Sequence, residues 1–164
     1  MMLGMSLPTF TLFHVIISLI GIASGLVVVL GMLSAKRLPG WTAVFLVTTV
    51  ATSVTGFLFP ATKLLPSHVV GIISLVVLAI TLIAIYVKHL AGAWRAIYVV
   101  TAVLALYLNT FVGVVQSFLK VDSLHTLAPT GTETPFKVAQ ALLLLIFIVL
   151  GWRAVKKFRP PAAR

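Results

Sequence analysis

The chain has 164 residues, of which 61% are hydrophobic and 9% charged, and its mean hydropathy is +1.22. A soluble domain carries about 25% charged residues, so this composition excludes an ordinary soluble fold and predicts an all-α, polytopic membrane protein. The net charge of +10 does not indicate nucleic-acid binding, because Lys and Arg stand in short clusters between apolar runs. The absence of Cys excludes disulfides and thiolate metal sites.

Five apolar runs, each near the roughly 20 residues that cross a bilayer as a helix, predict one transmembrane domain over residues 1–164. Pro and Gly between the runs support the breaks. The predicted spans are residues 10–33, 41–59, 68–87, 96–119 and 136–155, followed by a basic cytoplasmic tail at 156–164. The first run is long and follows no basic segment, so we expect it to be retained rather than cleaved as a signal peptide.

The basic residues predict the orientation of these spans. Nine of the twelve Lys and Arg fall on one side, namely Lys36, Arg37, Lys88, Arg95, Arg153, Lys156, Lys157, Arg159 and Arg164. The other side holds Lys63, Lys120 and Lys137. Cytoplasmic loops carry the excess of positive charge, so we expect the N-terminus outside and the C-terminus in the cytoplasm. Trp41, Trp94 and Trp152 then fall at the cytoplasmic interface, where aromatic belts lie.

An internal repeat links the two halves of the first four spans. The segments KRLPGWTAVFLVTTV (36–50) and KHLAGAWRAIYVVTAV (88–103) match in order with one gap. Each follows an apolar run that begins with His-Val, at His14 and at His68. The pattern predicts that the first two spans and the next two are copies of one hairpin, related by an axis along the membrane normal.

Polar side chains concentrate in the outer half of the predicted spans. Asn109 lies 13 residues past Ala96, roughly 20 Å from the inner end of its helix, and polar groups at such depth suggest a functional site. We therefore predict an outward-facing polar pocket, whose candidate residues are His14, Thr55, His68, Asn109, Gln116 and Gln140.

This pocket predicts a non-catalytic membrane protein, either an accessory subunit or a bundle that binds a small ligand, lipid or quinone. One alternative is a redox protein that holds a b-type haem between His14 and His68. A second alternative is an outward-facing metal hydrolase that uses His14, His68 and His125. The spans contain no Asp or Glu, which argues against a carboxylate proton relay or cation-coupled transport.

Short loops predict that any partner docks within the membrane. Besides lipid, we expect a membrane protein or a second copy of the chain, and no nucleic acid. The small residues Gly21 and Gly25, or the stripe of polar and small residues on 96–119, are suited to such a contact if they face lipid rather than the bundle core.

Several stretches carry a resemblance: LPGWTAVFLVTTVATSVTGFLFP, HVVGIISLVVLA, LAGAWRAIYVVTAVLALYLN and LAPTGTETPF. Together they cover most of the chain and resemble a family of small bacterial inner-membrane proteins without an established activity. The resemblance implies a bacterial cytoplasmic membrane and implies no activity, cofactor or site residues.

Overall fold

The computed structural model describes residues 4–61 and 66–159, and its secondary-structure elements are all helical. Lys63 and residues 160–164, which include Arg164 of the predicted tail, lie outside the described residues. In chain order the elements are α1 Leu7–Leu33, α2 Pro39–Gly56, α3 Pro66–Leu82, the π-helix η1 Ile83–Val87, α4 Trp94–Lys120, α5 Asp122–Leu127 and α6 Thr134–Lys157.

The all-α fold is confirmed, and each predicted span coincides with a long helix. Four helices are long and apolar enough to cross a membrane: α1, α3 continued by η1, α4 and α6. The 18-residue α2 is not among them, since Pro39, Gly40 and many Thr residues lower its hydropathy. Neither α5 nor the π-helical end of the third span was expected from the sequence, because both depend on backbone details that apolar periodicity does not encode.

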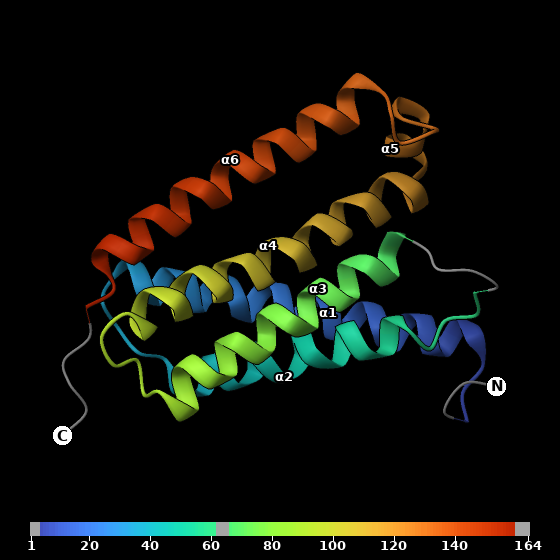
Figure 1. Cartoon of the computed structure of the whole chain (residues 1–164). Helices are drawn as coiled ribbons and strands as arrows, with labels where there is room; N and C mark the ends of the chain where they lie inside the picture. Colours follow the sequence, from blue (N-terminus) through green and yellow to red (C-terminus); the bar gives the residue numbers. More distant parts are fainter. Residues whose placement is uncertain (1–3, 62–65, 160–164) are drawn as a thin grey trace.

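Helix α4 is the centre of the bundle and contacts α1, α2, α3 and α6. Its small residues Ala102 and Ala105, 1% and 0% exposed, let the neighbouring helices approach closely. Figure 1 shows α1, α2, α3 and α4 as a compact group, with α6 lying along its outside. Only Phe147 and Ala154 of α6 are buried, so most of this helix faces outward.

Close approach of α1 depends on glycine. A Cβ added at Gly25 would lie 2.6 Å from Cδ1 of Leu106 and 2.9 Å from the ring of Phe45. Both Gly21 and Gly25 are buried, so this pair faces the bundle core and leaves no lipid-facing contact surface for a partner.

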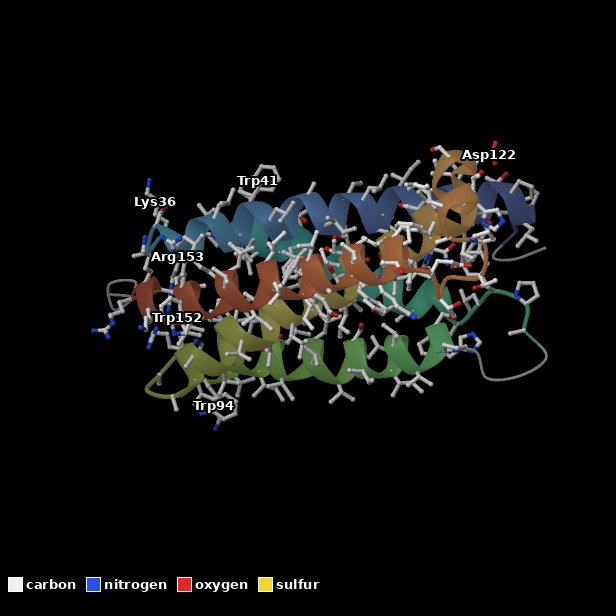
Figure 2. The ribbon with its side chains drawn as sticks, turned by 90° about the horizontal axis from the view of Figure 1, so that it is seen from above. Lys36, Trp41, Trp94, Asp122, Trp152 and Arg153 are labelled. Atoms are coloured by element: carbon white, nitrogen blue, oxygen red, sulfur yellow. The ribbon has the colours of Figure 1, made fainter. Side chains whose placement is uncertain are left out.

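The two ends of the bundle differ in charge. Figure 2 shows Lys36, Trp94, Trp152 and Arg153 toward one end and Asp122 at the other. The start of α1 and the end of α6 also lie at opposite ends of the bundle in Figure 1. We refer below to the end with Lys36 as the basic end.

Candidate functional site

His14 joins α1 to the last turn of α2. Its Nδ1 atom lies 2.7 Å from Oγ1 of Thr55, and its ring meets the edge of Phe59 with centroids 5.1 Å apart. Thr55 donates its single hydroxyl hydrogen to the carbonyl oxygen of Ala51 at 2.7 Å. His14 must therefore donate from Nδ1, which leaves Nε2 as the acceptor nitrogen.

Further polar contacts join α1 to α2 and α1 to α4, and together with the contact between His14 and Thr55 they form a polar seam. The Ser18 hydroxyl donates to Oγ1 of Thr52 at 3.4 Å. The Asn109 amide, 8% exposed, donates from Nδ2 to the carbonyl oxygen of Ser18 at 3.4 Å. A Cβ at Gly21 would lie 3.0 Å from that Nδ2, so the absence of a side chain there makes room for the amide. These contacts act as interhelical hydrogen bonds within the bundle.

The remaining predicted pocket residues lie apart from this polar seam. Gln116 is exposed near the C-terminal end of α4. The ring of His68 stacks on Phe57 with centroids 5.6 Å apart. Gln140 of α6 donates from Nε2 to the carbonyl oxygen of Phe111 at 3.3 Å. The structure thus brings His14 together with Thr55, and places Asn109 on a neighbouring part of the same seam, but Gln116, His68 and Gln140 lie at other contacts.

Metal-binding geometry is absent from the described part of the chain. Within residues 4–61 and 66–159, no three His, Asp or Glu side chains come together as a group that could hold a metal ion. His125 is exposed on α5. The described residues therefore offer no support for the metal-hydrolase alternative.

Gln140 carries the one buried side-chain polar atom without a hydrogen-bond partner among the described residues, its Oε1. The bond from Nε2 to a carbonyl fixes the orientation of the amide, because a carbonyl oxygen needs a donor opposite it. An unmatched acceptor in an apolar surrounding costs about 1–3 kcal/mol. A group that donates a hydrogen bond is therefore favoured at this position.

A groove of about 300 Å³ lies between α4 and α6, on the basic-end side of this amide, and Gln140 is not among its lining residues. Its walls include Tyr107 and Leu144, which lie one helical turn from Phe111 and Gln140 respectively. The groove then continues toward the basic end past Phe147, Gly151 and Trp152, and its surface is almost wholly apolar. A long apolar chain fits such a groove.

A second cavity, of about 220 Å³, lies at the basic end. Its lining includes Lys36, Arg37, Thr42, Tyr86 and Tyr98. Sequence reasoning assigned the two cations to membrane orientation alone and did not consider a site here. The adjacent Lys and Arg were a visible signal, but only the packing of α1, α2, η1 and α4 brings the hydroxyls beside them.

Comparison of the chain with protein-family models, with curated proteins and with solved structures finds no match. Function is therefore argued from the geometry of these sites.

Proposed function

We propose that the chain crosses a bacterial inner membrane five times, with its N-terminus outside and its C-terminus in the cytoplasm. The start of α1 and the end of α6, at opposite ends of the bundle, support an odd number of crossings. At 1.5 Å per residue the 18 residues of α2 extend about 27 Å, close to the roughly 30 Å of a hydrocarbon core. The basic residues gathered at one end support the orientation.

The proposed duplication of the first hairpin has a structural counterpart. Leu38 and Leu90 occupy the same place in the two matched segments, and both line the cavity at the basic end. Equivalent loops that meet around one cavity are what an axis along the membrane normal would produce.

Within this bundle, the proposed function is non-catalytic binding of one amphiphilic molecule between α4 and α6. The observation that carries it is the unmatched Oε1 of Gln140, one helical turn from Leu144 in the wall of the apolar groove. A ligand with a long hydrocarbon or isoprenoid chain and a hydroxyl head satisfies both features. A quinol fits better than a quinone, because a quinone carbonyl cannot donate to Oε1.

Binding of such a molecule is also compatible with an accessory subunit that delivers the molecule to a larger membrane protein. The outward face of α6 is the surface left for a membrane-protein partner or a second copy, since Gly21 and Gly25 are inside the bundle.

Trp152 lines the groove and can report its occupancy. In a variant with Trp41→Phe and Trp94→Phe, Trp152 is the remaining tryptophan of the three. We would titrate detergent-solubilised protein with dibromostearyl alcohol, and in parallel with dibromostearic acid methyl ester, which cannot donate a hydrogen bond. The alcohol should quench Trp152 fluorescence with about three- to tenfold higher affinity than the methyl ester, as expected from the free energy of one intramembrane hydrogen bond.

Gln140→Leu should abolish this preference for the alcohol, because it removes the acceptor. Leu145→Ala, at a residue 58% exposed on the same helix, is the matched control and should keep it. Equal quenching by the two probes in the parent protein would overturn the proposal.

Haem binding at His14 and His68 is the second candidate function. One observation favours it: His14 donates from Nδ1, so its Nε2 has the free lone pair that an iron ligand needs. Each imidazole nevertheless packs on a different phenylalanine, Phe59 for His14 and Phe57 for His68. A reduced-minus-oxidised absorption spectrum of protein expressed with added haem tests this candidate, and a spectrum without Soret, α and β bands would reject it.

A further inference from the structure

The cavity at the basic end is lined by residues of α1, α2, η1 and α4 and of the connections between them, with Phe158 from the end of α6. Lys36 and Arg37 come from the connection between α1 and α2, and Thr42 from the first turns of α2. Tyr86 and Tyr98 come from η1 and α4. The volume of about 220 Å³ far exceeds the roughly 10–15 Å³ that one water molecule needs. The space is therefore large enough for a ligand.

The backbone holds the two cations in place at this cavity. Ala35 has φ of 55°, and the amide of Lys36 donates to the carbonyl oxygen of Gly31 at 2.9 Å, while that of Ala35 donates to Met32 at 3.1 Å. These two bonds form a Schellman turn at the end of α1. Leu38 packs over Gly31, where a Cβ would lie 2.6 Å from its Cδ1. The turn thus fixes the direction in which Lys36 and Arg37 leave the bundle.

No acidic side chain neutralises these cations. The chain has two acidic residues, Asp122 and Glu133, and both follow the far end of α4. The 27 residues of α4 place that end about 40 Å from the cavity. This distance is several times the Debye length of about 8 Å at physiological salt. The positive charge at the cavity is therefore uncompensated by any Asp or Glu side chain.

The start of α2 and two hydroxyl groups also favour an anion at this cavity. Leu38 at the start of α2 provides no side-chain cap, and the first turn contains no acidic residue, so the positive end of the helix dipole is also unbalanced. The hydroxyl-bearing side chains of Tyr98 and Thr42 both line this cavity. Arg95, by contrast, is engaged elsewhere, since it donates to the carbonyl oxygens of Val155 and Phe158.

The rest of the lining is apolar, with side chains such as Val28, Met32 and Phe158. Cations and hydroxyls on one part of a cavity and hydrocarbon on the other match a molecule with a phosphate group and an apolar portion. We propose that this cavity binds an organic phosphate, whose phosphate oxygens accept hydrogen bonds from Lys36, Arg37 and the hydroxyl pair. Both a lipid headgroup of the adjacent leaflet and a soluble phosphate offer this chemistry.

This inference goes beyond the proposed function and does not depend on it, because the cavity shares no lining residue with the groove between α4 and α6. Loss of binding at one site leaves the other measurable.

The test uses the full chain in a neutral detergent and three probes at constant ionic strength. Dihexanoyl phosphatidic acid presents a phosphate with a short apolar part, dihexanoylglycerol lacks only the phosphate, and inorganic phosphate lacks the apolar part. Isothermal titration calorimetry gives the dissociation constant of each. We expect phosphatidic acid to bind and dihexanoylglycerol not to bind.

A double variant, Lys36→Gln with Arg37→Gln, should weaken the binding of phosphatidic acid by about tenfold or more, as expected when charge-assisted hydrogen bonds are lost. Its matched control, Lys120→Gln with Lys137→Gln, removes the same charge at the opposite end of the bundle from residues that do not line the cavity. The control should change the dissociation constant by less than about twofold, because exposed distant charges are screened.

Tyr98→Phe removes one hydroxyl without changing the shape of the cavity and should weaken binding by about threefold or more. This variant decides the question if the double variant does not insert or fold. Inorganic phosphate that binds as tightly as phosphatidic acid, with the same sensitivity to Lys36 and Arg37, would support the site and identify a soluble ligand as its source. The proposal is overturned if neither phosphate probe binds, or if both double variants weaken binding equally.

Discussion

Nδ1 of His14 donates a hydrogen bond to Oγ1 of Thr55 across 2.7 Å, although 41 positions separate the two residues. The bond links α1, at the end of the bundle opposite the basic end, to the last turn of α2. It gives His14 a structural role that requires neither a metal nor a cofactor.

The coupling between these two side chains can be measured by a double-mutant cycle with His14→Ala and Thr55→Val. We expect an interaction free energy of about 0.6–2 kcal/mol, as for other interhelical hydrogen bonds in membranes. Unfolding in SDS followed by circular dichroism provides the free energies. The control pairs His14→Ala with Thr101→Val, since the Thr101 hydroxyl donates only to carbonyl oxygens of its own helix, at Ile97 and Tyr98. That pair should be additive, and additivity in the test pair too would contradict the assigned bond.

Gly25 should tolerate no side chain. Gly25→Ala places a Cβ 2.6 Å from Leu106 and 2.9 Å from Phe45, so we expect a loss of about 1–3 kcal/mol in the free energy of unfolding. Gly113→Ala is the matched control, because its Cβ would meet Ile22 at an ordinary contact distance of 3.5 Å. The control should be neutral or slightly stabilising, and equal destabilisation by both changes would show that the α1 packing is not as described.

Ala35→Gly should stabilise the protein by about 0.5–1 kcal/mol, because Ala35 has φ of 55° at the position of the Schellman turn that favours glycine. The same replacement at Ala91, in the matching loop, is the control, since Ala91 is not among the residues with positive φ. The midpoint of thermal unfolding reports the difference. A lower midpoint for Ala35→Gly than for the parent protein would argue against this turn.

Glu133 precedes α6 and has a pKa lowered from 4.5 to about 2. Loss of hydration acts to raise this pKa, but hydrogen bonds donated to the carboxylate by Thr130 and by the backbone amide of Thr132 outweigh it. The carboxylate therefore stabilises the loop fully above pH 4.5, and this contribution is lost as the pH falls from 4.5 through about 2.

The amide NMR signals of Thr130 and Thr132 should show this titration, with an inflection near pH 2 that disappears in Glu133→Gln. An inflection near 4.5 in the parent protein would mean that the loop does not hold the carboxylate as described.

The membrane crossing of α2 can be tested directly because the chain contains no Cys. In intact cells, a membrane-impermeant maleimide should label Ala61→Cys, just after α2, and should not label Ser34→Cys, just before it. Labelling of Ser34→Cys only after the membrane is permeabilised completes the test. Equal labelling of both sites in intact cells would place them on one side and remove α2 from the set of spanning helices.

The sequence by itself determined the class of protein and the positions of the helices. Apolar composition and the placement of Pro, Gly and charged residues are local properties, and a chain this apolar has to satisfy its backbone hydrogen bonds within helices. The small stripes at Gly21, Gly25, Ala102 and Ala105 were likewise readable as packing faces, and the structure places all four inside the bundle.

Only the tertiary structure decided which polar residues meet. Spacing along one helix does not encode the order of helices around α4, so the sequence predicted one outer pocket where the structure has an interhelical seam at His14 and Asn109 and a separate amide at Gln140. The cavity at the basic end depends in the same way on packing. Thr42 and Tyr98 lie far apart in the chain, and both line this cavity because glycines at positions 25 and 31 allow α1, α2 and α4 to approach closely.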